Sequence, residues 1–268
     1  MARLRRSRLL FLLRSVAAAS LICGAAGCKT IGSGDTTGSV SGPAALPAGS
    51  EAALRRELDA AAERYRANPR DTSVAIRYAY ALRAIGQRSQ AAAVLEQASL
   101  EHPKDRAVLG AYGRALADAG RHEQAFDVLS RAHTPEQPDW RVLSAQGAVL
   151  DNMGRHEEAR RYYASALKLA PDEPSVLSNL GLSYALSRQL PEAENALRRA
   201  AAKAPAGQRI RQNLALVIGL QGRFEEAEAM SKADLPPDQA AANVAYLREM
   251  LARHPARPGR PPSVAQGS

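Results

Sequence analysis

The chain has 268 residues, 46% hydrophobic but only 4% aromatic, and this alanine-rich composition favours closely packed helices over β-sandwiches or barrels, whose strands favour β-branched and aromatic residues. Its two Cys and 24% charged residues exclude a disulfide-rich or wholly disordered chain. The formal charge of +9 comes from the chain ends, with five arginines before residue 28 and three after residue 252, so we expect no nucleic-acid partner.

The first 27 residues have the pattern of a secretory signal peptide. Arg3 to Arg8 form a basic start, Leu9 to Ile22 are apolar apart from Arg14 and two Ser, and a run of small residues follows. The apolar segment is too short and too interrupted for a membrane-spanning helix. We therefore expect residues 1–27 to be a lipoprotein signal peptide; a cytoplasmic protein with a basic arm is the alternative.

The signal peptide ends at a candidate lipidation site. Ala25-Ala26-Gly27-Cys28 resembles the lipobox of bacterial lipoproteins, in which this Cys is acylated and becomes the mature N-terminus. Two or more acyl chains make a stable anchor at roughly 0.8 kcal/mol per buried CH2. By resemblance to lipoprotein sorting in enteric bacteria, Lys29 in place of Asp implies the periplasmic face of the outer membrane. A plain cleaved signal with an incidental Cys is the alternative.

The next two segments lead into the folded part. Residues 28–50 are rich in Gly, Ser and Thr without periodicity, and predict a flexible tether with a reach of roughly 25 Å. Residues 51–71 predict an N-terminal capping helix, which runs to Ala67 and ends before Pro69.

Residues 72–241 repeat at a period of 34 residues. We number the positions of each repeat from 1 to 34, starting at residues 72, 106, 140, 174 and 208. Position 15 is Gly in four of the five repeats and Arg188 in the fourth. Independent alanine and proline series at positions 20 and 32 exclude coincidence. The three series are Gly86, Gly120, Gly154 and Gly222; Ala91, Ala125, Ala159, Ala193 and Ala227; and Pro69, Pro103, Pro171 and Pro205.

These positions resemble the tetratricopeptide (TPR) signature, with large residues at 4, 7 and 11, a small residue at 8, Ala at 20 and Pro at 32. Positions 4, 7, 8 and 11 lie on one face of a first helix, and the small residue at 8 lets a second helix approach. Gly at 15 turns the chain in a left-handed conformation, and Pro at 32 ends the second helix. We predict an all-α, right-handed TPR superhelix of about five helical hairpins.

The C-terminal end departs from the repeat. The fifth repeat has Ser231 and Asp234 at positions that are apolar elsewhere, and it breaks at Pro236-Pro237. A last helix is expected from about Asp238 to Arg253, with residues 242–253 forming a C-terminal cap. The proline-rich residues 254–268 predict a disordered tail.

The sequence contains no recognisable catalytic, metal or cofactor motif, and we expect neither an enzyme nor a small-molecule substrate. His122 and His156 are 34 residues apart and are interpreted as equivalent surface positions at helix starts. The acidic pairs Glu157-Glu158 and Glu225-Glu226 are likewise repeat-equivalent, and are interpreted as solvated faces of second helices.

The TPR resemblance implies that the first helices line a concave inner surface that binds segments of partner proteins. Positions 2, 5, 6, 9, 12 and 13 would form it, and basic residues near its N-terminal end with acidic residues midway predict a partner of mixed charge. The carboxylate clamp of some family members is doubtful, since Arg141 fits it and Ala145 does not. The candidate binding residues are Arg77, Tyr80, Arg83, Arg114, Asp118, Asp151, Asn152, Asn179, Arg209 and Asn213.

Two stretches outside the signature carry a more specific resemblance. His133 to Trp140 and Asp234 to Leu251, within a match over 50–252, resemble the TadD family of TPR lipoproteins from the Flp/Tad tight-adherence pilus apparatus. The resemblance implies a non-catalytic scaffold that binds proteins of the pilus secretion apparatus, with the outer-membrane secretin as the expected partner.

Three other functions are alternatives to this one. The same-class alternative is a pilotin-like or envelope-assembly TPR lipoprotein of another secretion system. A periplasmic cell-wall enzyme carrying TPR repeats is disfavoured because the repeats and their caps occupy the foldable chain. A cytoplasmic regulator would lack acylation at Cys28.

Overall fold

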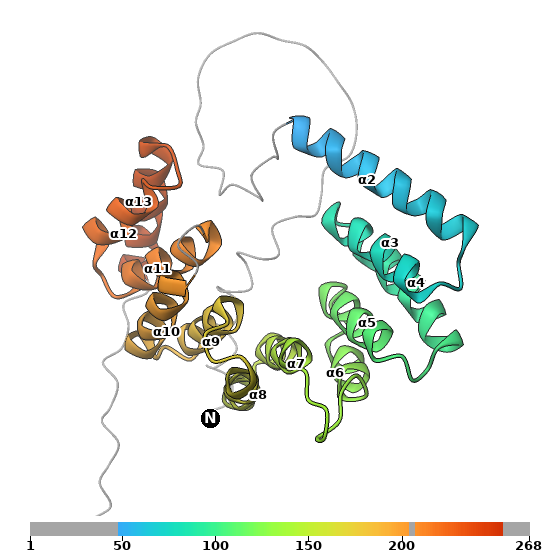
Figure 1. Cartoon of the computed structure of the whole chain (residues 1–268). Coiled ribbons are helices and arrows are strands. Elements are labelled where there is room, and N and C mark those ends of the chain that lie inside the picture. Colours follow the sequence, from blue (N-terminus) through green and yellow to red (C-terminus); the bar gives the residue numbers. More distant parts are fainter. Residues whose placement is uncertain (1–47, 204–206, 254–268) are drawn as a thin grey trace, which may run out of the picture. The chain divides into compact units, whose positions relative to one another are not determined.

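The computed structural model describes residues 48–203 and 207–253, and every regular element in them is an α-helix (Figure 1). The only β feature in these ranges is an isolated bridge between Thr134 and Gln137. The predicted all-α fold is therefore confirmed. The predicted signal peptide, Cys28, residues 29–47 of the tether and the tail 254–268 lie outside the described residues.

The helices alternate as the repeat predicts. The first helices of the five repeats are α3 (Thr72–Ala84), α5 (Arg106–Asp118), α7 (Trp140–Asn152), α9 (Pro174–Leu186) and α11 (Gln208–Leu220). The second helices are α4 (Arg88–Glu101), α6 (His122–Ser130), α8 (His156–Leu169), α10 (Leu190–Lys203) and α12 (Phe224–Ser231). They are flanked by α2 (Ala48–Ala67) and α13 (Pro237–Arg253).

The chain divides into two units, residues 1–57 and 58–268. The described part of the first unit is the beginning of α2. In the second unit, the rest of α2 packs on the first hairpin: Ala61 is buried, and the rings of Tyr65 and Tyr78 stack with their centroids 5.1 Å apart. This part of α2 therefore caps the apolar face of repeat one.

Position 15 has the predicted left-handed conformation in every repeat. Gly86, Gly120, Gly154 and Gly222 have φ between 77° and 84°. Arg188, the one exception to glycine, keeps the same turn at φ 61°. The turn is thus set by the repeat and not only by the preference of glycine, and Arg188 adopts a conformation that disfavours side chains with a Cβ.

Position 8 is small because the two helices of a hairpin touch there. A Cβ added to Gly113 would lie 2.5 Å from Cγ of Leu129, and one added to Gly181 would lie 2.7 Å from Cγ of Leu197. In repeat three, a Cβ added to Gly147 would lie 2.6 Å from Cε1 of Tyr163. The predicted role of position 8 is confirmed.

Position 34 carries an acidic cap that the sequence reasoning overlooked. Asp71, Asp105, Asp139 and Glu173 each precede a first helix, and each carboxylate accepts a hydrogen bond from a backbone N–H of the first turn. The distances run from 2.7 Å at Arg141 to 3.3 Å at Ser175. Such caps typically contribute about 1 kcal/mol each to helix stability.

The stack within the second unit has an inner and an outer side. The backbone of each first helix approaches the first helix of the next repeat, from α3 and α5 through to α11 and α13. Among the described residues, no second helix makes such an approach to the next second helix. The first helices therefore lie on the shorter, inner side of the stack, as the TPR resemblance implied.

Both ends differ in part from their predicted bounds. Helix α2 begins at Ala48, inside the predicted tether. Helix α13 matches the expected last helix from about Asp238 to Arg253 within one residue, and it begins before the cap assigned to 242–253. At the end of α12, Ser231 Oγ donates to the carbonyl of Ala227, and Asp234 pairs with Arg211. None of the described helices has the length and apolar character needed to cross a membrane.

Candidate protein-binding surface

The inner surface is formed by positions 2, 5, 6, 9, 12 and 13 of α3, α5, α7, α9 and α11. All ten predicted binding residues lie on these helices. Arg77, Tyr80, Asn152 and Arg209 are exposed, whereas Arg114, Asn179 and Asn213 are half-buried. Their contact with a partner stays a prediction, but the structure shows which of them are already engaged within the chain.

Four of the predicted residues form one cluster across repeats one and two. The guanidinium of Arg83 donates to Asp118 at 2.5 Å and lies over the ring of Tyr80, 5.7 Å from its centroid. Arg114 donates to the hydroxyl of Tyr80 at 3.1 Å. Asp118 is thus paired with Arg83, while Arg114 has a neutral oxygen and no carboxylate as its partner in the described part of the chain.

Asp151 is engaged in an internal network instead of presenting a free carboxylate. It accepts hydrogen bonds from Nδ1 of His156 at 2.8 Å, the hydroxyl of Tyr163 at 2.9 Å and the hydroxyl of Ser183 at 2.8 Å. Its side chain is only 10% exposed. Burial, and then the nearby Asp151 carboxylate, raise the pKa of Tyr163, which therefore stays protonated and able to donate.

The two repeat-equivalent histidines begin α6 and α8 as predicted, but neither is a simple surface residue. His156 is half-buried and bound to Asp151, whereas Nδ1 of His122 is buried with no partner among the described residues. The difference follows from position 12, which is Asp151 in repeat three and Ala117 in repeat two. The surface interpretation is corrected accordingly.

The two predicted asparagines connect successive repeats. Nδ2 of Asn179 donates to Ser144 Oγ at 3.3 Å, and Nδ2 of Asn213 donates to Ser178 Oγ at 3.2 Å. Each bond joins position 6 of one repeat to position 5 of the repeat before it. Asn at position 6 therefore has a structural role here, whatever it contacts in a partner.

The sequence reasoning missed an apolar patch on the same surface. Positions 9 and 13 are both leucine in repeats four and five, giving Leu182, Leu186, Leu216 and Leu220 on the contacting helices α9 and α11. Leu186 is 37% exposed and Leu216 is 45% exposed. We call these four residues the leucine patch. The repeat register already contained this signal.

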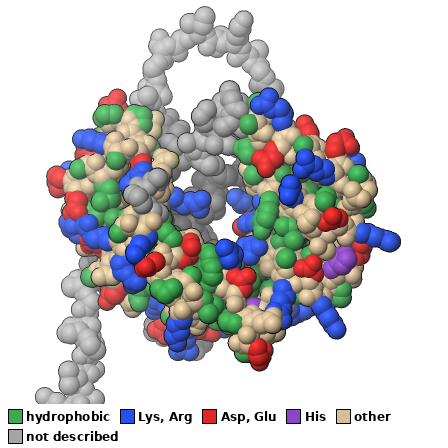
Figure 2. Space-filling model, in the orientation of Figure 1, with side chains coloured by type: hydrophobic (Ala, Val, Ile, Leu, Met, Phe, Trp, Pro, Cys, Tyr) green, Lys and Arg blue, Asp and Glu red, His purple; other side chains and the backbone are tan. Residues whose placement is uncertain are grey.

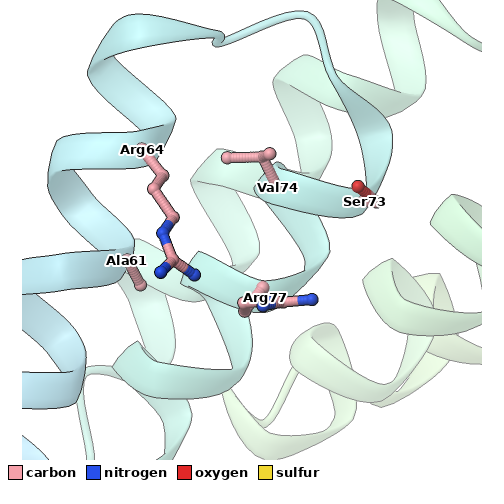
Figure 3. A pocket seen from close by; sticks show the side chains of 5 residues that line it. All are labelled: Ala61, Arg64, Ser73, Val74 and Arg77. Carbon is pink, nitrogen blue, oxygen red and sulfur yellow. The ribbon is translucent and has the colours of Figure 1, made fainter.

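A small cavity of about 220 Å³ lies between the second half of α2 and α3. It is lined by Ala61, Arg64, Ser73, Val74 and Arg77. Figure 3 shows Arg64 reaching from α2 toward the ribbon of α3, with Val74 and Ser73 on the helix that it faces. The cavity adds a second arginine beside the N-terminal end of the inner surface.

The predicted charge pattern changes once these pairs are counted. Asp118 is bound by Arg83 and Asp151 by three donors, so the middle of the inner surface is not acidic. Arg77, Arg114 and Arg141 have no carboxylate partner among the described residues. At the inner-surface positions of the first three repeats, four arginines therefore face two aspartates, although these repeats as a whole carry equal numbers of acidic and basic residues. Figure 2 shows basic side chains bordering the hollow of this view.

The described residues contain no group of three or more His, Cys, Asp or Glu that could hold a metal ion. The surface offers cations, a tyrosine ring, amides and leucines, which suit recognition of a polypeptide.

Comparison with known families matches two segments of the stack. Residues 86–149 and 144–207 each match a family model described as tetratricopeptide repeat. The repeats belong to the tetratricopeptide-repeat family. Members of this family typically act as protein-binding scaffolds, which agrees with an inner surface made from first helices.

Solved structures support the same fold. PilW, a type IV pilus biogenesis factor, has a TM-score of 0.63 at 16% identity over 73% of this chain and 92% of its own. A thermophilic TPR protein from Thermus thermophilus has a TM-score of 0.57 at 24% identity over 68% of this chain and 97% of its own.

The APC/C tetramer Cut9-Hcn1 matches with a TM-score of 0.58 at 16% identity, over 72% of this chain but only 40% of the Cut9-Hcn1 chain. At these identities the likeness shows the fold alone. The search of curated protein sequences gives no match.

Proposed function

We propose that the protein is a non-catalytic scaffold that binds a segment of a partner protein on its inner surface. The observation that carries the proposal is the row of first helices. Within the described chain, one continuous side of the stack presents arginines without a carboxylate partner, exposed Tyr80 and the leucine patch. Large exposed apolar side chains set beside such cations are typical of protein-binding surfaces.

The second part of the proposal concerns where the protein is located in the cell and which secretion system it serves. An acylated Cys28 would hold the scaffold at the outer membrane, where tethering raises the effective concentration of a neighbouring partner to about the mM range. The stretches His133 to Trp140 and Asp234 to Leu251 resemble the TadD family, which supports a role in Flp/Tad pilus assembly with the secretin as partner. The pilus factor PilW shares the fold.

The first of those stretches forms a distinct local structure. Helix α6 ends early at Ser130, and the following loop is fixed by His133, whose Nε2 donates to the buried Gln146 at 3.0 Å. Gln146 in turn donates to Ser130 Oγ at 3.1 Å. Gln146 stands at position 7, where repeat four has an apolar residue, so this loop is a specific feature of the chain and not a generic part of the repeat.

Membrane attachment is tested by Cys28→Ala. The variant should move from the membrane to the soluble fraction, with unchanged helical circular dichroism, because the acyl chains attach only at this residue. Metabolic labelling with a fatty acid should disappear in parallel. Retention of Cys28→Ala on membranes would contradict the lipoprotein assignment.

The partner is tested by photo-crosslinking in cells from Tyr80 and from Leu216, which lie on the inner surface. We expect both positions to capture the same protein, identified by mass spectrometry, while Leu100 on the outer side of α4 does not. Capture of a pilus secretin supports the Flp/Tad assignment. Capture of a component of another secretion system would favour the pilotin-like alternative.

A further inference from the structure

We propose that the inner surface recognises a segment with two chemically distinct blocks, an acidic block held by repeats one to three and a leucine-rich block held by repeats four and five. This inference rests on the proposed scaffold function and specifies the chemistry of its partner. It also replaces the expectation of a mixed-charge partner.

The division is visible in positions 9 and 13, which face the inner side four residues apart on each first helix. Position 9 is Tyr80, Arg114 and Ala148 in the first three repeats, and position 13 is Ala84, Asp118 and Asn152. Both positions become leucine in repeats four and five. At positions 9 and 13 the inner surface therefore changes from mixed residues to leucine between α7 and α9, while the polar residues Asn179, Asn213 and Arg209 remain at positions 6 and 2 of the later repeats.

The leucine patch lies on two neighbouring helices. Residues four apart on one helix are neighbours, and α9 and α11 approach each other directly, so the patch has two leucines at the same two positions of each helix. Leu186 and Leu216 remain 37% and 45% exposed. An apolar side chain placed here would remove water from both leucines, which favours binding in proportion to the apolar area buried.

The inner surface of repeats one to three attracts carboxylates. Among the described residues, Arg114 has the hydroxyl of Tyr80 as its hydrogen-bond partner and no carboxylate, and Arg141 stacks on the ring of Trp140 at 4.3 Å from its centroid. Arg77 is exposed on α3. Of the two acids at inner positions of this half, Asp118 is paired with Arg83, and Asp151 is 10% exposed with its oxygens bound by three donors. The three arginines therefore outnumber the one carboxylate that has no arginine partner. A guanidinium can donate two parallel hydrogen bonds to one carboxylate, so these arginines suit acidic side chains of a partner.

The chain's own ends do not fit this chemistry. Residues 1–47 contain five arginines and one lysine with a single acid, Asp35, and residues 254–268 contain two arginines and no acid. Like charges facing the basic half would disfavour their binding. We therefore assign the surface to a segment of another protein.

The test selects peptides from a random display library on the full-length purified chain. Peptides of about 16 residues suffice, since five helices about 10 Å apart span roughly 40 Å and an extended chain covers about 3.3 Å per residue. Enriched peptides should carry a cluster of Asp or Glu and a separate cluster of Leu, Ile or Met. The most enriched peptide is then synthesised for affinity measurements.

Paired variants test which part of the inner surface binds each block of the peptide. Leu186→Ser with Leu216→Ser should weaken the peptide about tenfold or more at every salt concentration. Arg77→Ser with Arg114→Ser should weaken it about fivefold at low salt and little at about 0.5 M salt, where exposed charges are screened. The matched controls replace outer residues, Leu100→Ser with Leu169→Ser and Arg88→Ser with Arg161→Ser, and should bind as the wild type does.

Each outcome is decisive. Enriched peptides that lack the acidic block, or that lose affinity equally in the outer controls, would overturn the two-block inference while leaving the scaffold function intact. Absence of any enriched peptide on the folded chain would contradict both. If an inner variant unfolds, the salt dependence of the wild-type affinity still decides, because a peptide held without an acidic block would not weaken with salt.

Discussion

At the scale of single residues, position 15 isolates the effect of backbone conformation. A Cβ added to Gly120 meets nothing within 4 Å, so a substitution there acts through its φ of 79° and not through a clash. Gly120→Val should destabilise the fold by about 1–3 kcal/mol, because a β-branched residue strongly disfavours this conformation. A thermal melt should show a decrease of several degrees.

Arg188 provides the matched comparison in the opposite direction. Arg188→Gly should raise the melting temperature by about one or two degrees, since relief of the left-handed strain is partly offset by the greater freedom of glycine in the unfolded chain. An unchanged melt for Gly120→Val, or a lower one for Arg188→Gly, would show that the turn is not under this strain.

The pair Arg211 and Asp234 replaces an apolar contact. Repeats two to four have Leu at position 4 and Ala at position 27, and repeat five has Arg211 and Asp234, with Nε of Arg211 donating to the carboxylate at 3.0 Å. Asp234 is only 7% exposed. Hydrogen bonds from Arg211, opposed by burial, lower the pKa of Asp234.

Removing one partner of the pair should lower the free energy of unfolding more than replacing both partners does. Asp234→Ala should lower the free energy of unfolding by about 2 kcal/mol, because it leaves Arg211 without this carboxylate. The double variant Arg211→Leu with Asp234→Ala restores the pattern of the other repeats and should recover most of the loss in urea unfolding. A double variant as unstable as the single one would contradict this account.

At the scale of helices, ion pairs join the second helices of repeats four and five. Glu194 on α10 accepts from Arg198 at 2.8 Å and from Arg223 at 2.8 Å, and Arg198 reaches Glu226 on α12 at 3.0 Å. Burial acts to raise the pKa of Glu194, but hydrogen bonds from Gln221, Arg223 and Arg198 lower it to about 2. The second helices, whose backbones do not approach, are connected through these side chains.

This cluster makes stability depend on acid pH. Because the pKa of Glu194 is lower in the folded chain than in the unfolded chain, its contribution is present above a pH of about 4.5 and is lost as the pH falls toward about 2. Glu194→Gln should reduce stability at pH 7 and flatten the loss between pH 5 and pH 2, as measured by urea unfolding at each pH. A pH profile parallel to that of the wild type would exclude this role.

At the scale of the whole second unit, contacts are local, because each helix packs only on helices near it in the chain. Stability should therefore be a sum of repeats and their interfaces. Gly181→Val would place its Cβ 2.7 Å from Leu197 and 3.1 Å from the carbonyl of Ala193, which overpacks the fourth hairpin.

Amide hydrogen exchange can measure directly how far the destabilisation spreads from the fourth hairpin. In Gly181→Val, amides of α9 and α10 should lose protection most, those of α7 and α11 less, and those of α3 least. Peptide-resolved mass spectrometry distinguishes this gradient from a uniform loss. A uniform loss would mean that the stack unfolds as one unit and that local contacts do not govern it.

Most of the fold followed from periodicity, because positions 8, 15, 20 and 32 act within a single hairpin. The start of α2 at Ala48 was missed because Gly49 and Ser50 are weak helix formers. The acidic caps at position 34 were missed although their spacing was present in the sequence.

The binding surface was less predictable, since its charges depend on pairs between repeats. Arg83 and Asp118 are 35 residues apart, and Ser183 reaches back 32 residues to Asp151. Sequence position assigned all of these residues to the inner surface, but only side-chain geometry shows which of them are used internally. The leucine patch needed no such pairing and could have been recognised from its register.

The acidic cap at position 34 has a consequence for how the chain could change its length. Repeats one to three each end in the carboxylate that caps the next first helix, whereas repeat four ends in Gly207 and supplies no side-chain cap. Duplication of one of the first three units would therefore leave the following first helix capped. The bonds to Asp151 restrict this freedom, because its donors come from His156 and Tyr163 in the same unit and Ser183 in the following one. An extra unit inserted between repeats three and four would therefore separate Ser183 from Asp151 and leave this carboxylate with one donor fewer.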